Sequence, residues 1–190
     1  MTTEQLYSEL NHVNHSREKR LHYANLVLAN PDLIPKLLDI LFQVDDKISP
    51  RAGWVLEFMC STNIATITPY LDVFTNNIHK VHLDSAVRPV AKICELIAKA
   101  YTCKTKNDLQ RHLKNSYKER IIATCFDYMI NDEKVAAKAY GMTTLFMLGK
   151  EFDWVYPELE GILISDFQNQ SAAFKARARH ILRKLKKLKS

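Results

Sequence analysis

The sequence predicts an all-α protein, and three observations point to this class. Apolar residues recur at the spacing of an amphipathic helix through most of the chain, and strand-like alternation does not persist anywhere. Only four of the 190 residues are glycine, fewer than the turns of a β-rich domain would need. Three dipeptides of a capping residue followed by proline mark expected helix starts along the chain. Together they predict an α-α superhelix of about five antiparallel helix pairs in a single domain.

The helix starts are marked by capping residues. Asn30-Pro31, Ser49-Pro50 and Thr68-Pro69 place a capping side chain before a proline. At the first helical position proline loses nothing, because its missing N–H would have no acceptor within the helix. Further caps are expected at Asp84, Asn131 and Ser171, and a capping box at Ser116 with Glu119.

Apolar stripes between these marks define the helices. Leu33, Ile34, Leu37, Leu38 and Leu41, for example, fall on one side of a helix. The stripes and caps together predict helices over residues 3–11, 16–29, 31–43, 50–62, 69–80, 85–101, 116–130, 133–149, 156–168 and 171–188.

Composition limits the class of protein further. The N-terminus is polar and lacks the apolar segment of a signal peptide, and runs such as Leu37–Phe42 are too short to span a bilayer. No two of the four cysteines (Cys60, Cys94, Cys103 and Cys125) have C-x-x-C spacing, and most have apolar neighbours. We therefore expect reduced cysteines, no membrane span and a cytoplasmic location.

The helix-turn-helix units repeat along the chain. Four segments share a basic residue beside small residues and an apolar ladder, with the basic residue at Arg51, Arg88, Lys138 and Arg177. Their separations are 37, 50 and 39 residues, and the long middle interval contains a polar stretch from 102 to 115. Without that stretch the period approaches the roughly 40 residues of helical solenoid repeats.

One repeat carries a recognisable motif. The segment 84–91, Asp-Ser-Ala-Val-Arg-Pro-Val-Ala, resembles the D-x-x-V-R-x-x-A pattern of HEAT repeats in the HEAT/armadillo superfamily. The resemblance implies four units over 31–190 after a capping helix pair at 1–30. It also implies a structural ladder, in which an aspartate of one unit pairs with an arginine of a neighbouring unit. In this chain the ladder residues would be Asp84 and Arg88, and Arg51 and Lys138 would take the place of the arginine in other units.

A solenoid of this kind would use its second helices for binding, because they line an extended groove. Lys92, Glu95 and Lys99 are the strongest candidates for contact, since Arg88 can be consumed by the ladder. The groove mixes charge signs, which favours a protein or peptide partner, with nucleic acid as the main alternative; a small-molecule substrate is not expected. The polar positions expected to be exposed there are Arg51, Glu57, Arg88, Lys92, Glu95, Lys99, Lys138, Arg177 and Arg179.

The C-terminal helix suggests nucleic acid as the alternative partner. The net charge of +6 is concentrated there, because residues 171–190 carry eight cations and no acid. Such a surface can neutralise phosphates, although this helix has no aromatic residues interleaved among its cations, as base stacking would need. A solubilising end cap is the simpler interpretation. Its expected apolar stripe is Phe174, Ala178, Ile181, Leu185 and Leu188, and its binding cations are Arg177, Arg179, Arg183, Lys184, Lys186 and Lys187.

Two constellations resemble chemical sites. His15, Glu18 and His22 share a helix face, but a polar outer face explains them better than a metal site, and we predict no metal or cofactor. The segment Phe152–Pro157, taken with Trp54, resembles the aromatic and aspartate chemistry of HEAT-like alkylpurine DNA glycosylases. No catalytic position matches residue by residue, so no catalytic residue is predicted.

The whole chain also resembles short bacterial proteins often labelled adenylosuccinate lyase. The resemblance lies in segments such as N-H-S-R-E-K-R, V-D-D-K-I-S and A-A-F-K-A-R-A. True lyases of that superfamily are far longer and carry a loop with the pattern S-S-x-M-P-x-K-x-N, which this chain lacks. We therefore predict a non-catalytic binding scaffold and no lyase activity.

Overall fold

The computed structural model describes residues 1–189, and these residues contain helices and no strand. The predicted all-α class is thus confirmed. The α-helices are α1 (Thr3–Leu10), α2 (Arg17–Ala29), α3 (Leu33–Leu41), α4 (Ser49–Thr62), α5 (Leu71–Asn77), α6 (Asp84–Tyr101), α7 (Asp108–His112), α8 (Asn115–Ile130), α9 (Val135–Leu148), α10 (Val155–Ser165) and α11 (Ala172–Lys189). Short 3-10 helices are η1 (Ile64–Tyr70), η2 (Ile78–Lys80), η3 (Gly149–Glu151) and η4 (Phe167–Asn169).

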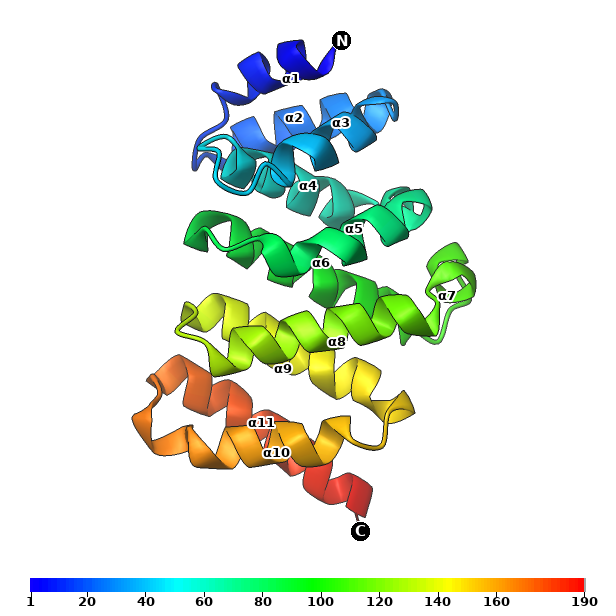
Figure 1. Ribbon diagram of the computed structural model, residues 1–190. Coiled ribbons are helices and arrows are strands. Elements are labelled where there is room, and N and C mark those ends of the chain that lie inside the picture. The colour runs from blue at the N-terminus through cyan, green and yellow to red at the C-terminus, as the bar shows by residue number, and fades with distance from the viewer. Residues whose placement is uncertain (190) are drawn as a thin grey trace.

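Contacts between the helices arrange them in two layers (Figure 1). In the first layer α2 packs on α4, α4 on α6, α6 on α9, and α9 on α11. In the second layer α1 packs on α3, α5 on α8, and α8 on α10. The layers are joined where α3 meets α4, α8 meets α9, and α10 meets α11. The most extensive contacts therefore skip one or two helices along the chain, as between α4 and α6 or between α6 and α9.

A continuous apolar core lies between the layers. Leu37, Phe74, Ile93, Ile121 and Phe174 come from successive parts of the chain, and each is fully buried within it. Burying an aliphatic or aromatic side chain of this size stabilises the fold by about 1.5–3 kcal/mol. The core therefore extends through both layers from α3 to α11.

Two segments differ from the predicted helices. The expected helix over 69–80 is divided into η1, α5 and η2, and Pro69 lies inside the 3-10 helix η1. The polar stretch after α6, where no helix was predicted, contains the short helix α7. Asn107 caps α7 in a capping box with Gln110, a signal that the sequence carried and that we missed.

Several predicted caps are wrong. Ser49 is the first residue of α4, and its buried hydroxyl donates to the Leu41 carbonyl at 2.6 Å instead of capping. Asn30 is not the cap of α3, whose N-cap position is Asp32. Asn131 lies at the end of α8.

The remaining caps divide in the same way. Ser171 accepts a bond from the Phe174 amide at 3.3 Å, as expected of a cap. The Ser116 capping box does not form, because α8 begins at Asn115 and its N-cap position, Lys114, makes no side-chain cap bond. Asp84 is the first residue of α6, and Thr68 is buried within η1 with its hydroxyl unbonded.

Candidate binding surface

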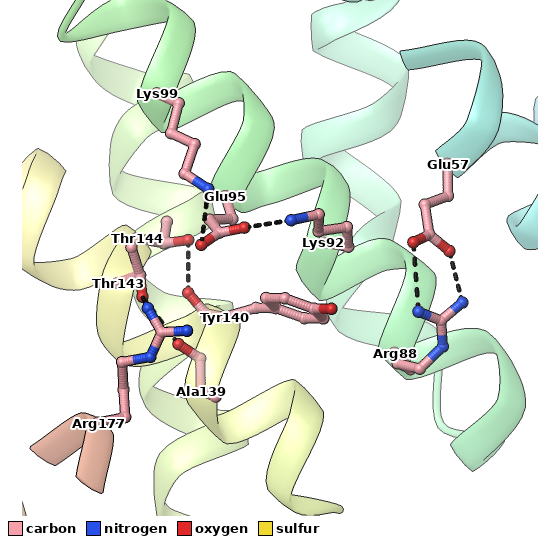
Figure 2. Close-up of polar contacts among 10 residues, drawn as sticks. All are labelled: Glu57, Arg88, Lys92, Glu95, Lys99, Ala139, Tyr140, Thr143, Thr144 and Arg177. Atoms are coloured by element: carbon pink, nitrogen blue, oxygen red, sulfur yellow. Dashed lines mark hydrogen bonds and ion pairs between the residues drawn. The ribbon is translucent and has the colours of Figure 1, made fainter. Parts of the chain in front are cut away.

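Glu95 of α6 is buried, which corrects the prediction that it is exposed. Glu95 is only 2% exposed, and its carboxylate lies between two lysines of the same helix (Figure 2). Lys92 Nζ is 2.7 Å from Oε2, and Lys99 Nζ is 3.1 Å from Oε1. A carboxylate withdrawn from water must be paired and hydrogen-bonded, and lysines one turn before and one turn after it satisfy both oxygens.

Arg88 of α6 pairs with Glu57 of α4, not with an aspartate. Its two terminal nitrogens lie 3.2 and 2.5 Å from the two Glu57 oxygens, which is the bidentate geometry of a strong ion pair. Glu57 is buried, again contrary to prediction. Asp84, the aspartate of the HEAT-like motif, instead lies 3.4 Å from Lys134, just before α9.

The other basic positions of the predicted ladder bond to backbone or hydroxyl groups. Arg51 donates to the carbonyls of Leu10 and Asn11 at 3.3 and 2.6 Å, where α1 ends. Lys138 is buried, contrary to prediction, and donates to the Met129 carbonyl at 3.3 Å. Arg177 of α11 donates to the Thr143 hydroxyl of α9 at 3.4 Å. None of these three pairs with an aspartate.

Cations of the first layer lie over aromatic rings of neighbouring helices. The Lys92 ammonium is 4.7 Å from the Tyr140 ring centre, and the Lys184 ammonium is 5.2 Å from that of Phe146. Such contacts hold a flexible cation in place without neutralising it. The sequence analysis missed these aromatic partners, since they lie on other helices than the cations.

These side chains form what we call the first-layer face. Arg88, Lys92 and Lys99 share one side of α6 at spacings of four and seven residues, and Arg177 and Lys184 share one side of α11. The two carboxylates among them, Glu57 and Glu95, are buried, whereas Lys99 and Lys184 are exposed. The face comprises Arg20, Trp54, Glu57, Arg88, Lys92, Glu95, Lys99, Tyr140, Arg177 and Lys184.

Helix α11 presents a second basic surface. Phe174, Ala178, Ile181 and Leu185 are buried as predicted, but Leu188 is 61% exposed because no further helix among the described residues covers this end. Arg183, Lys186 and Lys187 are exposed. Arg179 lies 5.3 Å from the Phe167 ring, at a groove of about 560 Å³ that Ile164, Phe167, Leu182 and the two arginines Arg179 and Arg183 line.

The histidines of the proposed metal constellation are separated in their contacts. The His15 ring packs on Trp54 with centres 5.0 Å apart, while the His22 ring lies edge-on to Tyr23. Within residues 1–189 no group of three or more histidine, cysteine, aspartate or glutamate residues is arranged to hold a metal ion.

The aromatic residues that resembled a glycosylase site also have different neighbours. Trp154 is 54% exposed and stacks on Phe126 at 5.5 Å. Trp54 is buried, and its indole N–H donates to the Ser85 carbonyl at 2.8 Å. The two tryptophans therefore pack against different helices.

Lys118 of α8 is a buried cation that the sequence analysis did not single out. Its ammonium donates to the Tyr101 hydroxyl at 2.9 Å and to a Glu151 oxygen, and the hydroxyl donates to the other Glu151 oxygen at 2.6 Å. Burial alone would lower the pKa of Lys118, but these bonds raise it above its ordinary value. They lower the pKa of Glu151, against the effect of its partial burial.

The cysteines and helix lengths bear on the other predictions. Cys60, Cys94 and Cys125 are buried, Cys103 is exposed, and all four are free thiols. Burial raises the pKa of Cys60, which disfavours the reactive thiolate form. Over residues 1–189 every helix is too short or too polar to cross a bilayer.

Comparison with known proteins identifies no matching family model, no similar curated protein and no similar solved structure.

Proposed function

We propose that this protein is a non-catalytic scaffold that binds an acidic protein segment along the first-layer face. The architecture that we propose is a HEAT/armadillo-like superhelix of about five helix pairs. The successive packing of α2, α4, α6, α9 and α11 supports it, because solenoids present an extended face of this kind.

One observation carries the choice of an acidic partner. The carboxylates of the first-layer face are buried and already paired, Glu57 with Arg88 and Glu95 with Lys92 and Lys99. The charges that this face exposes to solvent are therefore positive, since the Lys99 side chain is 46% exposed and the Glu95 side chain is only 3% exposed. A positive surface of this kind steers and orients a negatively charged partner.

Binding of a fluorescein-labelled hexaglutamate peptide, followed by fluorescence anisotropy at low salt, tests the proposal. The double variant Lys99→Gln/Lys184→Gln should weaken binding by about tenfold, with Lys92 still in place to hold Glu95. The matched control Lys104→Gln/Lys106→Gln removes two exposed lysines outside the face and should change the affinity little. Equal weakening by both pairs, or no binding by the unaltered protein, would contradict the proposal.

Nucleic acid is the second candidate, favoured by the exposed cations of α11. A short single-stranded oligonucleotide should then bind with log affinity falling linearly with log salt. Replacement of Arg183, Lys184, Lys186 and Lys187 by glutamate should abolish that binding. If the oligonucleotide binds no better than the peptide, and the replacement leaves its binding unchanged, α11 acts as a solubilising end of the stack.

An adenylosuccinate lyase is not proposed, since the serine loop of those enzymes is missing from the sequence. Incubation with adenylosuccinate should give no turnover.

A further inference from the structure

A small cavity lies at the N-terminal end of the first-layer face. Its volume is about 240 Å³, and its lining comes from the segment before α2 and from α2, α4, α6 and the start of α9. Among the lining residues are Arg20, Trp54, Asp84, Arg88 and Lys134. We call this cavity the Trp54 notch. Three of these five side chains are cations, and they approach from three different parts of the chain.

Arg20 is held rigidly at the notch, yet no acid neutralises it. Its Nε donates to the Asn14 carbonyl at 3.2 Å, and its guanidinium carbon lies 4.6 Å from the centre of the Trp54 ring. Within residues 1–189 no carboxylate lies within ion-pair distance of it. Burial lowers the pKa of Arg20 and the charge of nearby Arg88 lowers it further, while the charge of Glu57 offsets part of this shift.

The other charges of the notch are already matched. Arg88 is paired with Glu57, and Lys134 lies 3.4 Å from Asp84. Among the lining cations of the described residues, Arg20 is therefore the one without an ion pair of its own. An incoming anion can gain charge-assisted hydrogen bonds from a guanidinium whose position is fixed beforehand, so little side-chain entropy is lost on binding.

The shape of the notch indicates which anion it suits. Trp54 is 8% exposed and its indole N–H is bonded to Ser85, so the ring supports Arg20 and cannot stack on a nucleic-acid base. The Asp84 carboxylate at the rim would repel a dense array of phosphates. A single planar carboxylate matches the fork of one guanidinium and carries only one charge.

We propose that the Trp54 notch binds the carboxylate of one acidic side chain of the partner protein, with Arg20 as its principal contact. The inference rests on the proposed function, because the notch continues the first-layer face, and it names the anchor point of the acidic segment. Trp and Arg are the residue types that most often carry interface affinity, which agrees with this role.

The notch can be tested without the peptide, through the fluorescence of Trp54. The sequence contains two tryptophans, so the variant Trp154→Phe leaves Trp54 as the sole reporter. Titration with glutarate should give a saturable change in its emission. In the same background Arg20→Gln should weaken that binding by about tenfold, the loss expected for one charge-assisted hydrogen bond. Arg17→Gln, an exposed arginine of the same helix outside the lining, should leave it unchanged.

Each outcome decides between the ideas. No saturable response to glutarate, or equal weakening by both arginine variants, overturns the notch; if the hexaglutamate peptide still binds in a Lys99- and Lys184-dependent way, the proposed function stands without it. Tighter binding of inorganic phosphate than of glutarate overturns the carboxylate assignment and favours a phosphorylated or nucleic-acid ligand. Circular dichroism of each variant, matching that of the parent, shows that losses are not losses of fold.

Discussion

Two buried charges in this protein are stabilised in opposite ways. In the first layer, the buried carboxylate of Glu95 is paired with two lysines whose side chains are 23% and 46% exposed. In the second layer, the buried ammonium of Lys118 is paired with one carboxylate, Glu151, whose side chain is 43% exposed. In each site the buried group is fixed and its counter-ions reach the surface.

The difference lies in what each site shows to solvent. The Glu95 site leaves two cations at the surface, whereas the Lys118 site leaves one carboxylate there. The same principle of pairing a buried charge can thus give a surface of either sign. The pairing also predicts that the two partners differ in how much their removal destabilises the fold. Removing the exposed partner leaves a buried charge unpaired, whereas removing the buried group leaves only an exposed charge.

The largest effect is expected for Lys92→Met/Lys99→Met. This double variant removes both counter-ions of Glu95 and leaves a carboxylate with no compensation in the interior. The free energy of unfolding should fall by about 3–5 kcal/mol. Urea denaturation of this variant and of Lys104→Met/Lys106→Met, a control at exposed positions, measures the difference; a loss below about 1 kcal/mol would show that water reaches Glu95.

A smaller effect is expected for Glu151→Gln. The variant removes the charge that balances Lys118, but the Tyr101 hydroxyl still accepts from the ammonium. The expected loss in free energy of unfolding is about 1–3 kcal/mol near neutral pH. A variant as stable as the parent would mean that Tyr101 alone satisfies Lys118.

The pH dependence of the same variant follows from the direction of the pKa shifts. The pKa of folded Glu151 is lowered from 4.5, so its stabilising contribution is present above that pH and is lost as the pH falls through the folded pKa. The pKa of folded Lys118 is raised from 10.5, so its contribution is present below pH 10.5 and is lost as the pH rises through the folded pKa. The stability difference between parent and Glu151→Gln should therefore shrink below pH 4.5 and above pH 10.5 in denaturation series.

The smallest effect is expected for Lys118→Met. An apolar side chain of similar length removes the buried charge and leaves Glu151 in contact with water, so the loss should be about 1 kcal/mol or less. Thermal and urea denaturation of Lys118→Met and Glu151→Gln, measured side by side, show which variant loses more stability. If Lys118→Met proves the more damaging, the asymmetry drawn from the comparison is wrong.

The sequence predicted the helices well because amphipathic stripes are local signals. The expected helices over 16–29, 50–62, 85–101 and 116–130 lie within a residue or two of α2, α4, α6 and α8. The central residues of the core followed from the same stripes. Helix α7 was missed because its five residues are too few to show a period, although its capping box was visible.

The candidate site was only partly predictable from sequence, because burial of a charge depends on contacts between helices. Lys92, Glu95 and Lys99 were expected at the surface as contact residues, whereas the structure buries Glu95 between the two lysines. Glu57 is buried and is paired with Arg88, which lies 31 residues away on another helix. Arg20 escaped notice altogether, since its role depends on Trp54 in another helix.

The order in which the helices contact one another also has a kinetic consequence. In the main contacts between helices the partners are separated by no more than two α-helices along the chain, so none of these contacts has to join the two ends of the chain. Chains with mostly local contacts cross a low entropic barrier and fold quickly, and each helix can settle on its predecessor while later residues are still being synthesised. We expect refolding without long-lived intermediates, starting wherever two adjoining helix pairs first meet.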